Sequence, residues 1–196
     1  MMESDILRAF EETGALRTGH FHLSSGLHSD TYFQSALVLQ YPERADELAR
    51  SLASRLRESE PETIVGPALG GVVLGWEVAR VMGARGIFTE RADGKMALRR
   101  GFGVSPGERI AIVEDVVTTG KSTRETMAVL HASGAEVVAV GALVDRSAGR
   151  AALGVPFHAL LSLDVKAWDP SECPACAANI PVEKPGSRPV TGASSA

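Results

Sequence analysis

The sequence predicts an α/β protein in which helices flank a central parallel sheet and a small N-terminal hood is attached. Apolar runs of strand length alternate with helical patterns through the middle of the chain, and such alternation indicates crossover units on a parallel sheet. The 196 residues, 44% of them hydrophobic, can bury one real core but are few for two full domains. We therefore expect a single domain over residues 1–180, with the hood at about 15–40.

The N-terminal part is expected to contain two helices with a hairpin between them. "SDILRAFEETGAL" spaces Ile6, Leu7 and Phe10 at helical intervals, and "PERADELARSLASRLRES" opens on a proline and repeats leucine every four residues. Between them, "HFHLSSGLHSDTYFQ" places apolar and aromatic residues on both sides of a Ser-Ser-Gly turn. This pattern favours a small hairpin that serves as a lid, here called the hood.

The rest of the chain supplies the sheet. Strands are predicted in "TIVGPA", "RGIFTER", "RIAIVED", "EVVAVGALVDR" and "PFHALLSL", and helices in "GGVVLGWEVARVMG" and "GKSTRETMAVLHASG". The C-terminal "SECPACAANIPVEKPGSRPVTGASSA" is rich in proline, glycine and serine. Such composition is typical of a poorly ordered segment, and we expect a flexible tail over residues 181–196.

Charge and hydropathy exclude several classes of function. The chain has 20 basic and 24 acidic side chains, a net charge of -4, and no basic block, so we expect no nucleic-acid partner. No apolar stretch approaches the roughly 20 residues that span a bilayer, and "MMESDILRAFEE" lacks the features of a signal peptide. With only two cysteines, a disulfide-stapled secreted fold is not expected. The protein is expected to be cytoplasmic.

The stretch "VEDVVTTGKST", residues 113–123, carries the main chemical signal. A loop that feeds a helix N-terminus offers backbone N–H groups and a positive dipole end to a phosphate. Glycine lets such a loop close tightly, and threonine and serine add hydroxyl donors. Glu114 and Asp115 would repel a phosphate, so they should face sugar hydroxyls or a bound cation.

Neither a Walker A loop nor a plain capped helix accounts for this stretch. "GKS" invites comparison with a Walker A loop, but that motif needs a glycine five residues before Gly120, where this chain has Asp115. An ordinary strand followed by a Thr/Ser-capped helix would explain the threonines and the glycine. It would not explain two acids at the end of an apolar strand, where unpaired charge is costly.

"IAIVEDVVTTGKST" resembles the phosphoribosyl diphosphate signature of type I phosphoribosyltransferases. The resemblance implies the fold of that family, with Glu114 and Asp115 on the ribose hydroxyls and the following loop around the 5-phosphate. "GPALGG", residues 66–71, resembles the loop that holds the diphosphate group in this family. The residues implied to bind phosphoribosyl diphosphate are Ala68, Leu69, Gly70, Glu114, Asp115, Val116, Val117, Thr118, Thr119, Gly120, Lys121 and Ser122.

Residues outside this signature resemble the orotate branch of the family. "LSSGLHSDTYFQ" is similar to its N-terminal segment, in which a Ser-Gly turn and an aromatic pair close over the pyrimidine. Arg146, at the end of "VDR", takes the position of an arginine that binds the substrate carboxylate, and a guanidinium suits that task. The implied orotate contacts are Ser25, Gly26, Tyr32, Phe33, Thr118 and Arg146.

The segment "RADGKMALRR", residues 91–100, is dense in cations and lies between two predicted strands. Such a loop suits a mobile lid that neutralises diphosphate during transfer, and Arg91 and Lys95 are the expected catalytic cations. The familiar orotate enzymes carry lysines and a histidine that this chain lacks, having His28, Ala68 and Leu69 at the corresponding places. It resembles instead a divergent branch with a C-terminal "CPAC", so the identity of the catalytic cation stays open.

The resemblance implies transfer of ribose 5-phosphate from phosphoribosyl diphosphate to orotate, with Mg²⁺ as cofactor and a homodimer as the working form. Two alternatives stay open. A purine phosphoribosyltransferase would keep the donor and change the base, against which Arg146 and the hood argue. A phosphoribosyl-diphosphate-sensing regulator would keep the ligand without the reaction, against which the net charge of -4 argues.

Cys173 and Cys176 in "ECPAC" have the spacing of half a zinc site. Three alternatives are open: a free reduced pair, a redox-sensitive disulfide, or a shared metal site completed by His158 or by a partner subunit. His20, His22 and His28 gather on the hood, where histidines are expected at the surface or in contact with substrate.

Overall fold

The computed structural model describes residues 1–23 and 25–185, and these form two compact units. The first, here called the sheet unit, comprises Met1–Ala15 and Gln34–Asp164. The second, the hood unit, comprises Leu16–Phe33 together with the chain from Val165 onward. The hood expected at about residues 15–40 thus forms its own unit with the C-terminal segment.

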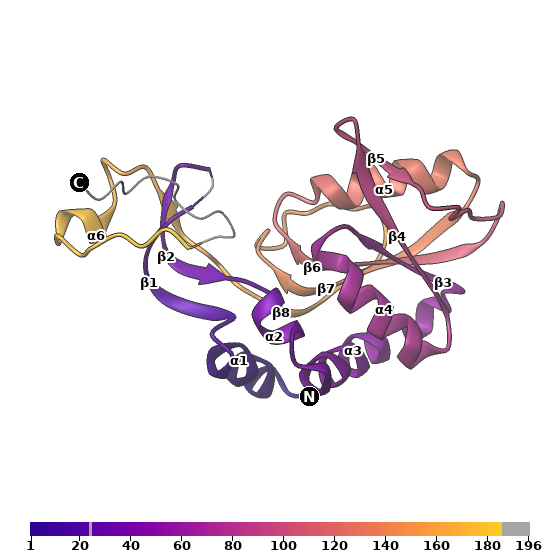
Figure 1. Cartoon of the computed structure of the whole chain (residues 1–196), viewed down its shortest axis with the longest axis horizontal. Helices are drawn as coiled ribbons and strands as arrows, with labels where there is room; N and C mark the ends of the chain where they lie inside the picture. Colours follow the sequence, from indigo (N-terminus) through magenta and orange to yellow (C-terminus); the bar gives the residue numbers. More distant parts are fainter. Residues whose placement is uncertain (24, 186–196) are drawn as a thin grey trace, which may run out of the picture. The chain divides into compact units, whose positions relative to one another are not determined.

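The sheet unit is built on six strands in the order β5-β4-β3-β6-β7-β8 (Figure 1). All neighbouring pairs are parallel except β4 and β5, which are antiparallel. The five predicted strands are present, and β5 is added to them at one edge. The bounds are β3 Thr63–Pro67, β4 Arg85–Ala92, β5 Lys95–Leu98, β6 Arg109–Val117, β7 Glu136–Asp145 and β8 Phe157–Ser162.

Helices cover both faces of this sheet (Figure 1). Helices α3 and α4 pack against each other and on one face, and α5 packs on the other. The predicted N-terminal helix is present and packs near β8. The bounds are α1 Glu3–Glu12, α2 Ala36–Leu39, α3 Pro42–Leu56, a 3₁₀ turn Arg57–Ser59, α4 Gly70–Met82 and α5 Lys121–Ala132.

The core is divided by the sheet into two layers. On the α5 face, Met127 and Leu130 pack with buried residues of the central strands, among them Val65, Ile110 and Ile112. On the opposite face, Leu52 of α3 lies so close to Gly141 of β7 that a Cβ there would be 3.2 Å from its side chain. Strands buried on both faces explain the continuous apolar runs in the sequence. The core therefore holds the carboxyl ends of the parallel strands at one fixed edge.

The segment 91–100, expected as a mobile loop, is mostly a β-hairpin. β4 and β5 pair from Thr89↔Leu98 to Ala92↔Lys95, and Asp93 and Gly94 form the turn with φ of 51° and 79°. An Asp-Gly pair with positive φ at both positions is the favoured two-residue hairpin turn. The turn signal is present in the sequence, but the density of cations around it favours a loop.

The hood unit is a three-stranded antiparallel sheet in the order β1-β2-β9, with one short helix. Its elements are β1 Leu16–His22, β2 His28–Phe33, β9 Ala167–Trp168 and α6 Pro174–Ala177. The predicted hairpin is present as β1 and β2, whereas β9, α6 and helix α2 of the sheet unit were missed. All three are too short to show a hydrophobic period.

The expected tail over 181–196 begins inside the described part of the chain. Glu183 bonds to β1 on both sides, because its N–H donates to the His20 carbonyl at 2.7 Å and its carbonyl accepts from His22 N–H at 2.8 Å. Its carboxylate pairs with the Arg17 guanidinium at 2.6 and 2.8 Å. The remainder of the expected tail, 186–196, lies outside the described residues. None of the helices in the described ranges is both long enough and apolar enough to span a membrane.

Candidate active site

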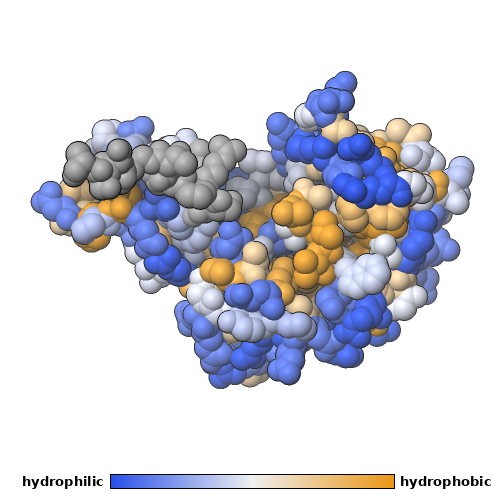
Figure 2. All heavy atoms as spheres, viewed as in Figure 1, coloured by the Kyte–Doolittle hydropathy of each residue, from blue (hydrophilic) through white to orange (hydrophobic). Residues whose placement is uncertain are grey.

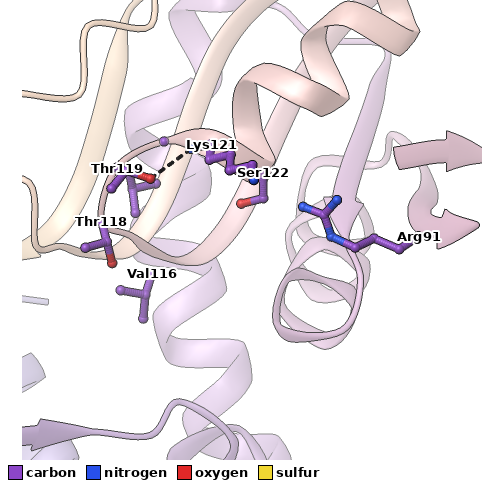
Figure 3. A pocket seen from close by; sticks show the side chains of 8 residues that line it. Arg91, Val116, Thr118, Thr119, Lys121 and Ser122 are labelled. Atoms are coloured by element: carbon purple, nitrogen blue, oxygen red, sulfur yellow. Dashed lines mark hydrogen bonds between the residues drawn. The ribbon is translucent and has the colours of Figure 1, made fainter. Parts of the chain in front are cut away.

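The site lies at the carboxyl edge of the parallel sheet, where β3, β6 and β7 end in the residues that the sequence singled out. Two cavities open there. The first, about 290 Å³, is lined by Arg91 and by every residue from Val116 to Ser122 (Figure 3). The second, about 460 Å³, is lined by residues that include Ser35, Leu69, Gly70 and Asp115.

The loop around the first cavity is shaped to hold an anion. Gly120, with φ of 69°, is the last residue before α5, so the first N–H groups of that helix have no helical acceptor. The Thr119 hydroxyl accepts from Lys121 N–H at 3.3 Å, drawn as the dashed line in Figure 3. Thr118 and Thr119 are exposed to the cavity side of the loop. Together these groups form a cradle of hydroxyl and amide donors.

Glu114 is buried at the end of β6 and serves this loop. Its Oε1 accepts hydrogen bonds from the Ser122 hydroxyl at 2.6 Å and the Thr123 hydroxyl at 3.3 Å. Burial raises the pKa of Glu114 to about 7, with the Asp115 charge adding to it and the two hydroxyl bonds opposing it. Ser122, expected only as a phosphate contact, therefore also ties α5 to the acid that precedes the loop.

Asp115 has a different environment, half-buried at the rim of the second cavity. It accepts a short hydrogen bond from the Ser35 hydroxyl and one from Val116 N–H at 2.9 Å. Gly70 allows this position, since a Cβ there would collide with the carboxylate oxygens. Ser35 was missed from the sequence because it is a single serine, 80 residues away, with no motif around it.

The turn Ala68–Gly70 connects β3 to α4 and shares the second cavity with Asp115. The Ala68 N–H donates to the Thr89 carbonyl at 2.7 Å, which fixes the turn against β4. Leu69 is 87% exposed, and α4 begins at Gly70, so the first N–H groups of the helix lie at this turn. One of them, Val72 N–H, donates to the Leu69 carbonyl at 3.3 Å. The three residues expected to hold diphosphate are thus brought beside one of the two expected ribose acids.

The two expected catalytic cations differ in position. Arg91 lies at the first cavity, and its guanidinium points toward the phosphate loop (Figure 3). It donates to the Gly94 carbonyl at 2.9 Å and pairs with Glu125 of α5 at 2.5 Å. Lys95 is exposed at the first residue of β5, at the tip of the hairpin. Arg91 thus lies with the 5-phosphate loop, and Lys95 is not among the residues lining either cavity.

Arg146 follows β7 directly, and its N–H donates to the Val117 carbonyl at 2.8 Å. This bond places it beside the start of the phosphate loop. Its Nε is buried and has no hydrogen-bond partner among the described residues, and burial lowers the pKa of its guanidinium. An unpartnered buried donor is costly, so a ligand that accepts from it would be stabilised.

The expected hood contacts lie in the other unit. Ser25 and Gly26 are exposed in the turn between β1 and β2, Tyr32 is half-buried with its ring centroid 5.6 Å from that of Phe21, and Phe33 is buried. Thr118 and Arg146 belong to the sheet unit. The residues expected to contact orotate are therefore divided between the two units.

The cysteines also lie in the hood unit. Cys173 and Cys176 are free thiols grouped with His20 and His28. His158, the alternative partner for them, lies in β8 of the sheet unit. His22 is the strand partner of His28, with their ring centroids 5.5 Å apart, and is not one of the four grouped side chains. His20 and His28, expected at the surface or in contact with substrate, are both buried, so the surface alternative is wrong for them.

Comparison with known proteins identifies the family to which this chain is similar. The phosphoribosyl transferase domain family matches residues 37–171. An orotate phosphoribosyltransferase of Desulforamulus reducens is 49% identical over 191 residues, 97% of this chain and 100% of that protein. The orotate phosphoribosyltransferase of Thermotoga maritima is 52% identical over 183 residues, 93% of this chain and 98% of that protein.

Solved structures agree on the fold. The orotate phosphoribosyltransferase of Aeropyrum pernix superposes with a TM-score of 0.66 at 25% identity and covers 81% of this chain and 93% of that one. An adenine phosphoribosyltransferase of Rhodothermus marinus gives 0.63 at 24% identity, covering 80% and 99%. The α/β fold predicted from the sequence is therefore confirmed as that of the type I phosphoribosyltransferases. By its family match and its near full-length relatives, the chain belongs to the phosphoribosyltransferase family of enzymes and, within it, to the orotate phosphoribosyltransferases.

Proposed function

We propose that this protein transfers ribose 5-phosphate from 5-phosphoribosyl 1-diphosphate to orotate. The bond between the anomeric carbon and the diphosphate oxygen breaks, and a bond from that carbon to N1 of orotate forms. The N1 proton is released, and the products are orotidine 5'-phosphate and diphosphate, a step of pyrimidine nucleotide biosynthesis.

The observation that carries the choice of acceptor is the buried Nε of Arg146. It lacks a partner among the described residues and lies beside the phosphate loop through the bond to Val117. Orotate brings a carboxylate, which a guanidinium binds through two parallel hydrogen bonds. A neutral purine would leave the buried donor unpaired.

The donor is divided between the two cavities. We assign the 5-phosphate to the loop Val116–Ser122, and the diphosphate to Ala68, Leu69 and Gly70. The ribose hydroxyls lie between, on Asp115 and on Glu114. Both hydroxyl bonds to Glu114 reach Oε1, which leaves Oε2 as its atom for the ribose.

Mg²⁺ is the proposed cofactor, held mainly by the diphosphate and sugar oxygens of the donor. The lining of the second cavity fits such a cation, because Asp115 is the one carboxylate among its lining residues in the described ranges. When bound, the ion neutralises charge on the leaving diphosphate. Asp115 would hold it through the ribose, with Ser35 keeping the carboxylate oriented.

The chain's own contribution is positioning and electrostatics. As the bond to diphosphate stretches, negative charge grows on the leaving group and positive charge on the sugar. The N-terminus of α4 and Lys95 are proposed to meet the first, and Asp115 the second. Arg91, which lines the phosphate-loop cavity, is proposed to hold the donor from the 5-phosphate side during the same step.

Two alternative functions, a purine phosphoribosyltransferase and a regulator that senses phosphoribosyl diphosphate, fit these residues less well. Likeness to adenine phosphoribosyltransferases under 25% identical concerns the fold alone, so it does not favour a purine. A regulator without catalysis would need a surface for its target, and a net charge of -4 without a basic block does not suit nucleic acid. Arg146 favours orotate over both.

Steady-state assays with phosphoribosyl diphosphate, Mg²⁺ and either orotate, hypoxanthine or adenine test the proposal. We expect turnover of orotate alone. Arg146→Ala should raise KM for orotate by about 100-fold or more, since one partner of a buried charge-assisted pair is lost, with KM for phosphoribosyl diphosphate nearly unchanged. Arg150→Ala, an exposed arginine four residues on, is the matched control. Turnover of a purine, or an unchanged KM in Arg146→Ala, would refute the assignment.

The working form is proposed to be a homodimer in the cytoplasm, where the two cysteines would stay reduced. Support for self-association comes from apolar side chains exposed on one side of the sheet unit, across α2 and α4, which are neighbours. Figure 2 shows apolar surface in this region. The residues are Leu37, Val73 and Trp76, between 37% and 65% exposed.

A further inference from the structure

We propose that the hood unit binds a structural Zn²⁺ ion through His20, His28, Cys173 and Cys176. These residues come from four places in the unit: the end of β1, the start of β2, the residue before α6, and α6 itself. The inference does not rest on the proposed function, because all four residues belong to the hood unit and none is among the residues assigned to the substrates. It completes the half site that the Cys-Pro-Ala-Cys spacing indicated, with two histidines that precede the cysteines by about 150 residues in sequence.

The distances suit a tetrahedral ion. One ligand atom from each residue lies within 4.8 Å of every other. The Sγ of Cys176 is 3.2 Å from His28 Nδ1 and 3.6 Å from His20 Nε2, and the Sγ of Cys173 is 3.4 Å from His20 Nε2. Zn–N and Zn–S bonds of about 2.0 and 2.3 Å at tetrahedral angles put neighbouring ligand atoms about 3.3–3.8 Å apart. The two histidine nitrogens, His20 Nε2 and His28 Nδ1, are 2.9 Å apart and would separate by a few tenths of an ångström when the ion binds.

The hydrogen bonding around His20 prepares its ring for a metal. His20 Nδ1 lies 2.7 Å from the Ile180 carbonyl, which can only accept, so this nitrogen carries the proton. The neutral ring therefore turns an unprotonated Nε2 toward the cysteines. A carbonyl that fixes the tautomer of a ligating histidine from behind is the usual outer partner of zinc sites.

Charge and burial agree with this assignment. His20, His28 and Cys173 are buried, and Cys176 is half-buried. When Zn²⁺ binds, two thiols release two protons and two neutral imidazoles donate lone pairs, so the complex has no net charge. A neutral complex can be buried at much lower cost than a bare ion or a thiolate pair.

The ion would replace a hydrophobic core that this unit lacks. Its buried described residues are His20, Phe21, His28, Ser29, Phe33 and Cys173, and only two of these are large and apolar. Units this small usually need disulfides or a metal to hold their chain segments together. Four protein ligands fill a tetrahedral shell, which is the pattern of a structural rather than a catalytic zinc site.

The same atoms allow a second arrangement without metal. His20 Nε2 and His28 Nδ1 are 2.9 Å apart, close enough for one N–H···N hydrogen bond. That bond would account for the two histidines but not for both sulfur atoms converging on them. A protein that binds no metal and keeps this histidine–histidine hydrogen bond is therefore the alternative that the experiment must distinguish from the zinc site.

Metal analysis of the full-length protein tests the proposal. After expression with added Zn²⁺ and gel filtration, we expect about one zinc per chain by mass spectrometry of the metal. Replacement by Co²⁺ should give the intense visible bands of a tetrahedral ion and a thiolate-to-cobalt charge-transfer band. Thiol titration in native protein should find both cysteines protected until the metal is removed.

Variants locate the site. Cys176→Ser and His28→Ala should each lose zinc, while His22→Gln, a neighbouring histidine outside the ligand set, should retain it. A wild-type protein that takes up neither Zn²⁺ nor Co²⁺ stoichiometrically would overturn the proposal, as would a Cys173–Cys176 disulfide in protein purified without reductant. The wild-type cobalt spectrum decides the question even where a variant fails to fold.

Discussion

Two adjacent acids, Glu114 and Asp115, end the same strand with different environments. Glu114 is 4% exposed and bonded to the hydroxyls of Ser122 and Thr123, whereas Asp115 faces a cavity beside Gly70. The alternation of side chains along a strand produces this difference, because successive residues point to opposite faces. Glu114 therefore organises the phosphate loop through Oε1, which leaves only Oε2 for the ribose, whereas the carboxylate of Asp115 is open to a ligand.

The pH dependence of stability should report on Glu114. Its pKa, about 7 in the folded chain against an ordinary value near 4.5, means that the native state binds more protons than the unfolded state between these pH values. The contribution of Glu114 to the free energy of unfolding therefore falls as pH rises through this window, by on the order of 3 kcal/mol. Glu114→Gln, which keeps an acceptor oxygen, should lose that fall.

The measurement is urea unfolding of Mg²⁺-free protein at pH 5 and pH 8. Relative to wild type, Glu114→Gln should gain stability between the two pH values. Glu58→Gln, an exposed acid, should not. Parallel pH curves for wild type and Glu114→Gln would show that the carboxyl is ionised throughout this range in the folded protein.

For the individual site residues, the sequence predicted which ones lie together but not which contacts each side chain makes. The order of apolar, acidic and hydroxyl residues placed Glu114, Asp115 and the loop at one strand end, as the structure has them. The bond from Ser35 and the packing of Gly70 on Asp115 depend on chain segments brought together by tertiary contacts. No local pattern encodes such contacts.

Most of the strands and helices that carry the site could be predicted from the sequence. Where a prediction was wrong, the error has a physical cause. Strands β3, β6 and β7 and helices α3 to α5 have long apolar periods, and each was predicted. The β4–β5 hairpin resembles a loop in sequence because its solvent-facing residues are basic, although its pairing depends on the backbone and on the Asp93-Gly94 turn. The hairpin holds Arg91 at the phosphate loop more firmly than a loop would.

Substitutions on this hairpin should separate two tasks. Arg91→Ala removes an exposed ion pair with Glu125 worth at most about 1 kcal/mol, so stability should change little. Because Arg91 lines the phosphate-loop cavity, KM for phosphoribosyl diphosphate should rise by about 10-fold or more. Lys95→Ala should mainly lower kcat, by about 100-fold, if it meets the leaving diphosphate.

Steady-state kinetics with both substrates varied measures this division. Arg99→Ala is the control, since Arg99 lies near Glu90 at 3.9 Å at the base of the same hairpin. Wild-type kinetics in Lys95→Ala would remove Lys95 from the reaction and leave Arg91 and the α4 N-terminus as the groups available to the donor.

For the whole molecule, the exposed apolar side chains across α2 and α4 predict self-association. Val73 and Trp76 are 50% and 65% exposed on α4, and an apolar patch of this kind commonly marks an interface. Val73→Glu should shift the protein from dimer toward monomer in light scattering after gel filtration. Ala128→Glu, which places the same charge on exposed α5, should leave the mass unchanged. A wild-type monomer at micromolar concentration would contradict the dimer.

The division into two units could not be predicted, because residues 16–33 and the C-terminal segment are joined by contacts across some 150 residues of sequence. Local patterns showed a hairpin and a proline-rich end, each too short to reveal the other. The ligand types were visible separately, as three hood histidines and a Cys-Pro-Ala-Cys pair. Only folding brings two of those histidines to the two cysteines.

Removal of the proposed zinc should therefore loosen one unit and spare the other. A chelator that prefers zinc to magnesium, used with excess Mg²⁺, is expected to increase amide hydrogen exchange in β1, β2 and the segment around α6. Exchange in β6 and β7 should stay unchanged, since the sheet unit has its own core. His22→Gln should respond to the chelator as wild type does, and Cys176→Ser should show the raised exchange without it. Equal exchange with and without chelator would mean that strand pairing and the Arg17–Glu183 pair hold the hood unit without a metal.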